Sequence, residues 1–592
     1  MKRRLRRKQS RPTAYVITET APIEAPSSVH FVRASGARVR HASRARVRIL
    51  MCAVLFAFVF SALGVRMAFI TFGQIDARPA RIAALDPAAP RSEIVDRNGA
   101  LLATDLPMIA LEIWGREVWD AEETAISIAQ ILNGVDSDVL SQKLANGQYV
   151  EVASDLSPAQ RRKIFDLGLP GVRFASRTKR FYPQADLAAH VIGHGEAGKG
   201  GVMGLEKIVG AVSASAKAPV RASIDIRVQQ ILEEELAAGM AEFSAKAAWG
   251  GVIDVNTGEV IALASLPDFD PNAPGAVEAD FRRNRAVYDR YELGSAFKAF
   301  TAAAALDAGA ASEFSTYDAR GVYQVADRRI GDFHGENREL TFSEVIQHSS
   351  NIGIVQIAEA LGVEAQKAYL ENLGLFEPLP IALPEKRAPE LPRKWGPVES
   401  ATVSYGHGIS VTPLHLLSAY AAVINGGVWR APVFLNGERG ESKKVFSKRT
   451  SAVMRRVLRR VIIDGTASKA DVAGYYPVGK TATADKPAAG GYDRSKRISS
   501  FVGAVPGHAP RYAILISYDE PEPTKDTFGY ATAGWNAAPS FANVVKRAAP
   551  LLGLAPTGEA EALAAFVADD LNGARKAQAD DAIGDLMGEA LR

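Results

Sequence analysis

The chain has 592 residues, of which 47% are hydrophobic and 23% are charged. This is the composition of an ordinary globular protein, and the length is too great for a single hydrophobic core. The formal net charge is only +4, and the single cysteine, Cys52, excludes both an intrachain disulfide and a cysteine-based zinc site.

The positive charge is concentrated at the N-terminus. Residues 1–48 contain thirteen Lys and Arg residues but only two acidic ones, Glu19 and Glu24, so they carry about +11 and leave about −7 for the rest of the chain. This segment has no apolar periodicity, and we expect a disordered basic arm. Such an arm binds either nucleic acid or an anionic membrane surface.

The next segment favours the membrane. Residues 49–65 are uncharged and mostly apolar, and the apolar character continues past Arg66 to residue 72. A helix over residues 49–72 would rise ~1.5 Å per residue, enough to cross a bilayer. A buried core helix is one alternative. A cleaved signal peptide is another, but the preceding charged region is too long for it. The positive-inside rule predicts that the arm is cytoplasmic and that the chain after residue 72 lies outside the cytoplasm.

The remaining chain reads as two α/β regions. Asp96-Arg97-Asn98-Gly99 predicts a hairpin turn in the first region, and Asn256-Thr257-Gly258 predicts a turn between two strands in the second. A buried strand is expected at 512–518 and a helix at 411–425. The predicted organisation is a disordered arm (1–48), a transmembrane helix (49–72), a linker (73–92), a first α/β domain (93–220), a second α/β domain (221–550) and a C-terminal tail (551–592).

The first motif with a chemical meaning is Ser295-x-x-Lys298, at the start of an Ala-rich helical run. The two side chains are one turn apart and share a face. A serine hydroxyl becomes a nucleophile when a base removes its proton, and lysine can be that base only when it is neutral. Taken alone, the motif is also compatible with an ordinary solvated helix start.

Two further clusters follow. Ser349-Ser350-Asn351 precedes a helical run and could simply cap it. Gly479-Lys480-Thr481 completes a formal phosphate-loop pattern, G-x-x-x-x-G-K-[ST], which would indicate a nucleotide-binding protein. That motif requires a buried strand before it and a helix after it, and the flanking sequence predicts neither.

Together the three clusters are more specific than any one of them. Ser-x-x-Lys, Ser-x-Asn and Lys-Thr-x occur in this order within one α/β region, which is the motif order of serine β-lactamases and penicillin-binding proteins. An anchored chain with an additional domain before the motifs suits a cell-wall synthase better than a free β-lactamase.

The sequence resembles the class B penicillin-binding proteins, and within them the cell-division transpeptidases of the FtsI type. The resemblance covers roughly residues 90–545. The segments that carry it are Arg91–Ala103, Arg180–Pro183, Val191–Gly193, Gly201–Glu206, Ser223–Asp225, Asn284–Ala286, Tyr291–Lys298, Ser349–Gly353, Gly406–Gly408 and Val411–Pro413. Ala482 departs from the pattern, because the family usually has glycine there.

The resemblance implies a fold, an activity and a set of roles. The fold is a transpeptidase domain, with an antiparallel sheet flanked by helices, preceded by an elongated α+β pedestal and one transmembrane helix. The activity is D,D-transpeptidation of peptidoglycan through an acyl-enzyme, inhibited by β-lactams. The implied roles are Ser295 as nucleophile, Lys298 as its base, Ser349 as proton relay, Lys480 as a positive charge, Asn351 as ligand of the donor amide, and Thr481 and Thr483 as ligands of the terminal carboxylate.

The same resemblance implies the surroundings of the enzyme. No metal or organic cofactor and no nucleic acid is expected. The expected partners are stem peptides ending in D-Ala-D-Ala, β-lactams, the inner membrane, the septal lipid-linked glycan polymerase and other division-complex membrane proteins. The protein is expected at the division site, with its catalytic domain in the periplasm. The rival hypotheses are a non-catalytic scaffold with this fold and a β-lactam-hydrolysing enzyme.

Overall fold

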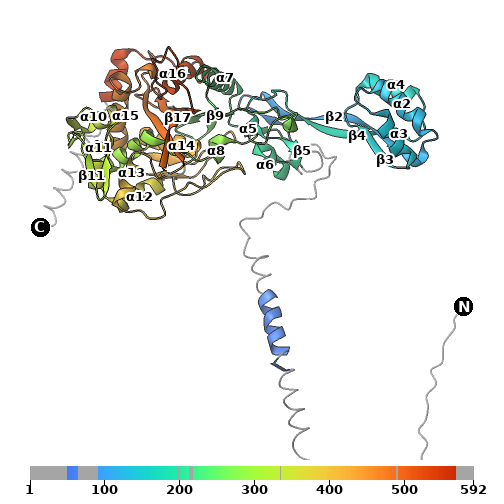
Figure 1. The fold of residues 1–592 in the computed structure, drawn as a ribbon, viewed down its shortest axis with the longest axis horizontal. Coiled ribbons are helices and arrows are strands. Elements are labelled where there is room, and N and C mark those ends of the chain that lie inside the picture. The colour runs from blue at the N-terminus through green and yellow to red at the C-terminus, as the bar shows by residue number, and fades with distance from the viewer. Residues whose placement is uncertain are drawn as a thin grey trace, which may run out of the picture. The chain divides into compact units, whose positions relative to one another are not determined.

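The computed structural model describes residues 50–51, 53–64, 91–196, 200–212, 218–333, 335–488 and 491–567 (Figure 1). The chain forms two compact units, Met1–Arg81 and Ile82–Arg592. The predicted arm (1–48), nearly all of the predicted linker (73–92) and residues 568–592 of the predicted tail lie outside the described residues.

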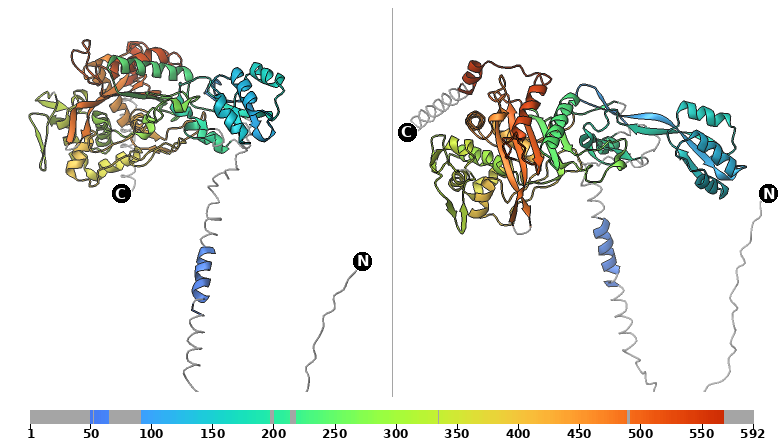
Figure 2. Two further views of the ribbon diagram at one scale, coloured as in Figure 1. Left: turned by 45° about the vertical axis from the view of Figure 1, so that its right-hand side comes forward. Right: turned by 45° about the horizontal axis from the view of Figure 1, so that its top comes forward.

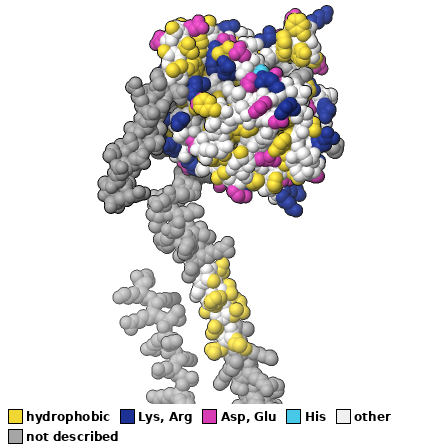
Figure 3. Space-filling model, turned by 90° about the vertical axis from the view of Figure 1, so that its left-hand side faces the viewer, with side chains coloured by type: hydrophobic (Ala, Val, Ile, Leu, Met, Phe, Trp, Pro, Cys, Tyr) yellow, Lys and Arg dark blue, Asp and Glu magenta, His cyan; other side chains and the backbone are white. Residues whose placement is uncertain are grey.

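In the first unit, residues 53–64 are helical and their side chains are exposed. The side chains include large apolar groups such as Phe56 and Phe58, and Figure 3 shows this helix covered by hydrophobic atoms. Residues 65–72 of the predicted span lie outside the described residues. No helix within the described part of the chain is long and apolar enough to cross a membrane.

The second unit begins with an α+β region built on a five-stranded sheet. Its strands are β1 (Ile94–Val95), β2 (Leu101–Trp114), β3 (Tyr149–Ala153), β4 (Val172–Phe181) and β7 (Val220–Arg221), in the order β3-β2-β1-β7, with β4 paired to β2. The predicted hairpin turn is confirmed: the Asp96 carboxylate accepts hydrogen bonds from the N–H groups of Asn98 and Ala100, and Gly99 has a φ of +95°.

The long antiparallel pair of β2 and β4 leads to a helical lobe with its own core (Figure 2). That lobe contains η1 (Gly115–Glu117), α2 (Ala121–Ile131), α3 (Ser137–Ala145) and α4 (Pro158–Asp166). Its core includes Leu111, Ile128 and Ile164 and is separate from the main core of the chain. At the other end of the pair lie α5 (Ala189–Ile192), β5 (Gly195–Glu196), β6 (Gly200–Gly201) and α6 (Gly204–Val212).

The larger region is organised around an antiparallel sheet in the order β16-β17-β18-β8-β9. Its strands are β8 (Ala247–Asp254), β9 (Val260–Leu266), β16 (Val478–Ala488), β17 (Gly491–Val505) and β18 (Tyr512–Asp519). The predicted turn at 256–258 joins β8 to β9, and the predicted strand at 512–518 is β18. Every residue of β8, β9 and β18 is buried, so helices cover both faces of the sheet.

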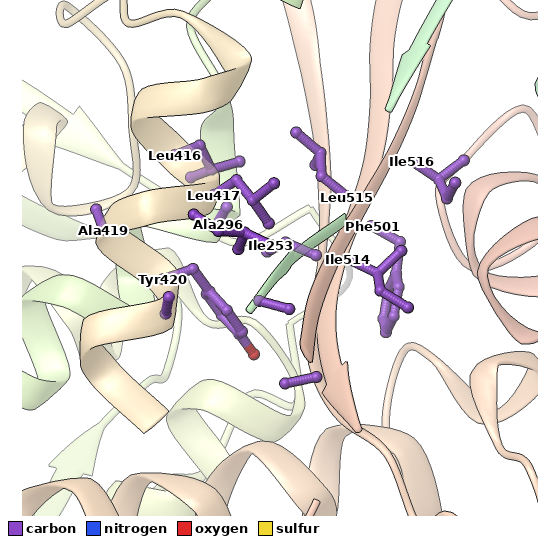
Figure 4. Packing of buried hydrophobic residues seen from close by; sticks show 14 of the residues in the cluster. Ile253, Ala296, Leu416, Leu417, Ala419, Tyr420, Phe501, Ile514, Leu515 and Ile516 are labelled. Atoms are coloured by element: carbon purple, nitrogen blue, oxygen red, sulfur yellow. The ribbon is translucent and has the colours of Figure 1, made fainter. Parts of the chain in front are cut away.

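Two adjacent glycines of β8 show which helices cover which face. A Cβ on Gly250 would contact Leu232 of α7 (Ile226–Glu242), whereas a Cβ on Gly251 would contact Leu417 of α14 (Pro413–Ile424). Because successive residues of a strand point to opposite faces, α7 and α14 lie on opposite sides. Figure 4 shows α14 packed on the sheet, with Ala296 between them. The helix predicted at 411–425 is α14.

The remaining elements complete the larger region. They are η2 (Pro274–Ala276), α8 (Arg285–Tyr288), η3 (Gly294–Phe297), α9 (Lys298–Asp307), β10 (Thr316–Asp318), β11 (Tyr323–Val325), β12 (Arg328–Ile330), β13 (Glu339–Thr341), α10 (Phe342–Gln347), α11 (Asn351–Leu361), α12 (Val363–Asn372), α13 (Pro397–Ser404), β14 (Val428–Arg430), β15 (Ser442–Lys444), α15 (Lys448–Ile463), η4 (Ser468–Ala470) and α16 (Ala537–Ala548).

Candidate active site

Ser295 lies in a tight turn against the edge strand of the sheet. The sequence predicted one continuous helix, but residues Gly294–Phe297 form the 3-10 turn η3, and the α-helix α9 begins only at Lys298. Gly294 has a φ of +52°, and a Cβ there would lie 3.2 Å from the Cβ of Ala484 in β16. The Ser295 side chain is half-buried, and its hydroxyl forms no hydrogen bond with any described residue.

Lys298 is completely buried directly behind this turn. Its amine donates to the Ser349 backbone carbonyl and, over 3.1 Å, to the Ser349 hydroxyl. Burial lowers the pKa of Lys298 well below the ordinary lysine value, and the charge of Lys480 lowers it further, whereas Asp332 acts in the opposite direction. A neutral amine in this place can accept a proton.

Ser349 is held in position by the backbone between α10 and α11. It has a φ of +60°, which is unusual for a residue with a side chain. The neighbouring Ser350 caps α11 by accepting a hydrogen bond from the Gly353 N–H at 3.0 Å. The capping function that the sequence allowed for this cluster therefore belongs to Ser350, which leaves the Ser349 hydroxyl directed at the lysines.

Lys480 approaches the same hydroxyl from β16. Its amine lies 3.0 Å from the Ser349 Oγ and 3.2 Å from the Thr481 carbonyl oxygen. The side chain is fully buried, which lowers its pKa to about 7. Since Lys480 and Thr481 lie inside a strand paired with β17, and not at the start of a helix, the phosphate-loop interpretation is wrong.

The two faces of β16 have different neighbours. Thr481 and Thr483 point to one side, where the Thr481 hydroxyl lies 2.6 Å from that of Thr466 and the Thr483 hydroxyl accepts the Ala533 N–H at 3.2 Å. Ala482 lies on the other face, is 3% exposed and shares this face with Lys480. This is the alternation that the sequence predicted.

The predicted residues do not all meet. Lys298, Ser349, Lys480 and Thr481 are joined by hydrogen bonds. Ser295 follows Gly294, where a Cβ would lie 3.4 Å from the Thr483 carbonyl oxygen, because η3 packs on β16. Asn351 is the exception. Its side-chain amide donates to the Gly331 carbonyl at 3.2 Å, and within the described part of the chain it forms no hydrogen bond with the other six.

Three residues around the site were missed by the sequence analysis. Asp332 caps α11, accepting hydrogen bonds from the Ser350 hydroxyl at 2.7 Å and the Ile352 N–H at 3.0 Å. Thr466 contacts Thr481, and Glu292 lies just before η3, the turn that contains Ser295. Asp332 and Thr466 lie in irregular segments with no periodicity, so no sequence signal points to them.

Comparisons with known proteins identify the family of the chain. The penicillin-binding protein transpeptidase domain matches residues 250–546, and the penicillin-binding protein dimerisation domain matches residues 86–199. A Caulobacter vibrioides protein described as a probable peptidoglycan D,D-transpeptidase FtsI is 41% identical over 78% of this chain and 82% of its own length. FtsI of Escherichia coli K12 is 29% identical over 75% of this chain and 81% of its own length.

A solved structure has the same fold. Penicillin-binding protein 3 from Mycobacterium tuberculosis, complexed with aztreonam, aligns with a TM-score of 0.64 and 25% identity over 80% of this chain and 98% of that one. The chain therefore belongs to the penicillin-binding protein transpeptidases. Within them it is a class B protein of the FtsI family, a serine-type peptidoglycan D,D-transpeptidase.

Proposed function

We propose that this transpeptidase uses Ser295 as its nucleophile and cross-links peptide stems at the division septum. One observation carries the assignment of roles: Lys298 and Lys480 both reach the Ser349 hydroxyl, and Lys298 directly follows the turn that contains Ser295. Neither lysine has an acidic partner within hydrogen-bonding distance among the described residues. Both amines can therefore exchange protons with a hydroxyl instead of being fixed in an ion pair.

Acylation then proceeds as follows. Neutral Lys298 takes the proton of Ser295, whose oxygen forms a bond to the carbonyl carbon of the penultimate D-alanine. The C–N bond to the terminal D-alanine breaks, and Ser349 passes a proton to the leaving amine and is reprotonated from the lysine pair. The N–H groups of Ser295 and Thr483 stabilise the oxyanion, which is worth a few kcal/mol per donor in such sites.

The second half-reaction reverses the proton path. An amine of the acceptor stem attacks the acyl-enzyme, a new amide bond forms, and the ester bond to Ser295 breaks. The proton from the amine returns to the Ser295 oxygen through the same groups. No metal or cofactor is needed, because the donor ester supplies the bond energy that the new amide requires.

The donor is bound along the edge of β16. Thr481 and Thr483 hold its terminal carboxylate with their hydroxyl groups, next to the positive charge of Lys480. Asn351 binds the donor amide, which requires its side chain to exchange the Gly331 carbonyl for the substrate. Among the described residues, β16 has a strand partner on only one side, and such an open edge suits a donor peptide in an extended conformation.

We also propose the organisation and location of the chain. Residues 93–220 are the pedestal, residues 221–550 the transpeptidase domain and residues 551–592 a tail. The apolar helix seen at 53–64 supports a single-pass inner-membrane anchor at 49–72, with the arm in the cytoplasm and the catalytic domain in the periplasm. The septal glycan polymerase and other division-complex membrane proteins are the proposed partners. The aztreonam complex of the Mycobacterium tuberculosis relative supports inhibition by β-lactams.

The test is made on the full-length protein in detergent. The protein is labelled with a fluorescent penicillin, digested, and the modified peptide is sequenced by mass spectrometry. In parallel, a D-Ala-D-Ala donor and an acceptor amine are supplied, and the cross-linked product is measured. Modification at Ser295 with product formation is expected. A folded protein that is not acylated would favour the scaffold hypothesis, and rapid release of the hydrolysed penicillin would favour a β-lactamase.

A further inference from the structure

Glu292 precedes Ser295 by three residues and is bonded to two segments that lie far from it in the sequence. Its carboxylate accepts a hydrogen bond from the Gly408 N–H at 3.0 Å and another from the Tyr492 hydroxyl at 2.9 Å. We propose that Glu292 is a positioning residue for acylation. It holds three segments in one arrangement: the turn at Gly294–Phe297 that contains Ser295 (the nucleophile turn), the loop at 405–408, and the end of the β16–β17 hairpin near Tyr492 (its outer end). This inference rests on the proposed role of Ser295.

The loop is in direct contact with the nucleophile turn. Gly406 has a φ of +83°, and a Cβ there would lie only 2.2 Å from the Gly294 carbonyl oxygen, so backbone packs on backbone. On the other side of Glu292, Tyr291 exchanges two backbone hydrogen bonds with Val411, of 2.9 Å and 3.0 Å. A shift of the loop is therefore transmitted to Gly294 and to Ser295, which follows it.

The hairpin needs such a contact because its outer end lacks a third strand. β18 pairs with β17 only from Ile498 onward, so within the described residues the part of β17 before that point has only β16 as a strand partner. A two-stranded ribbon is marginally stable by itself. The register also shifts between Asp485 and Lys486, two residues beyond Thr483, which gives the hairpin a place to bend.

Tyr492 fixes this outer end from the side of the nucleophile turn. In the ladder it lies opposite Pro487, and its ring stacks on His407 with a centroid distance of 5.1 Å and an interplanar angle of 24°. The hydroxyl and the ring of Tyr492 thus join the hairpin to both Glu292 and the loop. A second contact attaches the hairpin to β18: Lys486 of β16 forms an ion pair with Asp519 at 2.8 Å.

The chemistry of a carboxylate explains why glutamate suits this position. A carboxylate has lone pairs on both oxygens and can accept the Gly408 and Tyr492 protons at the same time, whereas glutamine has only one acceptor oxygen. Burial raises the pKa of Glu292, and the two hydrogen bonds act against this shift by stabilising the charged form.

The consequence for the reaction is geometric. The oxyanion is proposed to bind the N–H groups of Ser295, on the nucleophile turn, and Thr483, on β16. Glu292 is bonded to the hairpin that contains Thr483 and belongs to the segment that leads to Ser295. Loss of its contact should shift Ser295 relative to the Thr483 N–H while leaving Thr481 and Thr483 in place within β16. It should therefore slow the acylation step more than it weakens initial binding.

The experiment separates these two quantities. The full-length variants Tyr492→Phe and Glu292→Gln and the double variant are purified in detergent. Stopped-flow measurements with a fluorescent penicillin give the Kd of the initial complex and the limiting acylation rate of each protein. Thermal melting shows that each variant is folded under the conditions of the assay. Each single variant should lower the limiting rate about tenfold, which corresponds to ~1.4 kcal/mol, with Kd changed by less than about twofold. The double variant should be no slower than the slower single variant, because both remove one contact.

Tyr369→Phe is the matched control. Tyr369 also donates to a carboxylate, that of Asp307, at 3.0 Å, and its ring also stacks on an aromatic neighbour, Phe446. The Tyr369→Phe variant should be acylated by the penicillin at the same rate as the parent protein. If Tyr492→Phe is acylated at the parental rate, or if the losses of the two single variants multiply in the double variant, the inference about Glu292 is wrong. The proposed role of Ser295 would not be affected by either result. If the parent protein is not acylated at Ser295, the proposed nucleophile fails and this inference fails with it.

Discussion

Lys298 and Lys480 both donate to the hydroxyl of Ser349, at 3.1 Å and 3.0 Å, although one lies at the start of α9 and the other in β16. Two buried amines at such a short distance from one oxygen do not both carry a charge easily, because each charge is desolvated and repels the other. Burial lowers the pKa values of both lysines, and the charge of Lys480 lowers the pKa of Lys298 further. The arrangement suits the proposed roles of these groups, which are to supply a base for Ser295 and a proton for the leaving group.

The most direct prediction concerns Ser295. Ser295→Ala should abolish covalent penicillin labelling, because it removes the oxygen that forms the acyl-enzyme. Its melting temperature should remain close to that of the parent, since the hydroxyl forms no hydrogen bond with a described residue. In-gel fluorescence and thermal melting measure the two effects, and Ser312→Ala, at an exposed serine, serves as the control. Covalent labelling of a folded Ser295→Ala protein would refute the assignment.

A second prediction concerns the pH dependence of acylation. Only neutral Lys298 can act as a base, so the acylation rate should rise with pH as Lys298 loses its proton, at pH values well below those of an ordinary lysine. The charge of Lys480 disfavours the protonated form of Lys298. The substitution Lys480→Met removes this charge and should therefore raise the pKa of Lys298. The rising limb of the curve of acylation rate against pH should then move to higher pH.

This shift is measured from second-order acylation rates between about pH 5 and about pH 9, plotted as a logarithm for the parent and for Lys480→Met. The midpoint of the limb, and not the height of the curve, is the quantity to compare, because the variant will also be slower overall. A limb that stays in place or moves to lower pH would mean that Lys298 is not the group that titrates.

A third prediction concerns Thr466, whose hydroxyl lies 2.6 Å from that of Thr481. If Thr481 binds the terminal carboxylate of the donor, Thr466 orients its hydroxyl. Thr466→Val keeps the shape and removes the hydrogen bond, so it should raise the Kd of the initial penicillin complex several-fold and leave the limiting acylation rate within about twofold. Stopped-flow fluorescence separates the two constants. A fall in the limiting rate with unchanged Kd would contradict this role.

A fourth prediction concerns Ala482, where the family usually has glycine. The methyl group is buried on the face of β16 that Lys480 shares, and its neighbours accommodate it in the folded structure. Ala482→Gly should therefore fold and should be acylated at a rate within about tenfold of the parent, a difference of less than ~1.4 kcal/mol in the barrier. Parallel acylation rates with one penicillin test this. A hundredfold gain would show that Ala482 restricts the site and would revive the scaffold hypothesis.

The last prediction concerns topology. If residues 1–48 are cytoplasmic and the chain crosses the membrane at 49–72, a reporter that is active only in the periplasm should be active when fused after residue 72. The same reporter fused at residue 40 should be inactive, since the positive-inside rule retains the basic arm in the cytoplasm. Colony assays and immunoblots of both fusions measure activity and expression. Activity from the residue 40 fusion alone would reverse the orientation.

Much of the fold could be predicted because its signals are local. The turn at Asn256–Gly258 between β8 and β9, the buried strand β18 and the helix α14 follow from turn residues and hydrophobic periodicity within short windows. The order of the three motifs is likewise a property of the linear sequence. This order was sufficient to indicate the family and the proposed nucleophile, and the context around Lys480 was sufficient to reject a phosphate loop.

The interior of the site could not be predicted in the same way. The sequence cannot indicate that η3 is a 3-10 turn, because its shape depends on the packing of Gly294 against β16 and Gly406. The contacts of Thr466 with Thr481 and of Asp332 with α11 join segments that have no common periodicity. Such contacts are set by strand register and by the packing of layers.

The sequence by itself therefore determined the class of the protein, the residues proposed to carry its chemistry and the order of its elements, because motif chemistry and secondary-structure preference act over a few residues. Only the tertiary structure decided that Lys298 and Lys480 share the hydroxyl of Ser349, and that Glu292 connects the nucleophile turn to Tyr492. These relationships arise because the sheet and its covering helices bring segments far apart in the chain to within hydrogen-bonding distance, and burial then lowers the lysine pKa values.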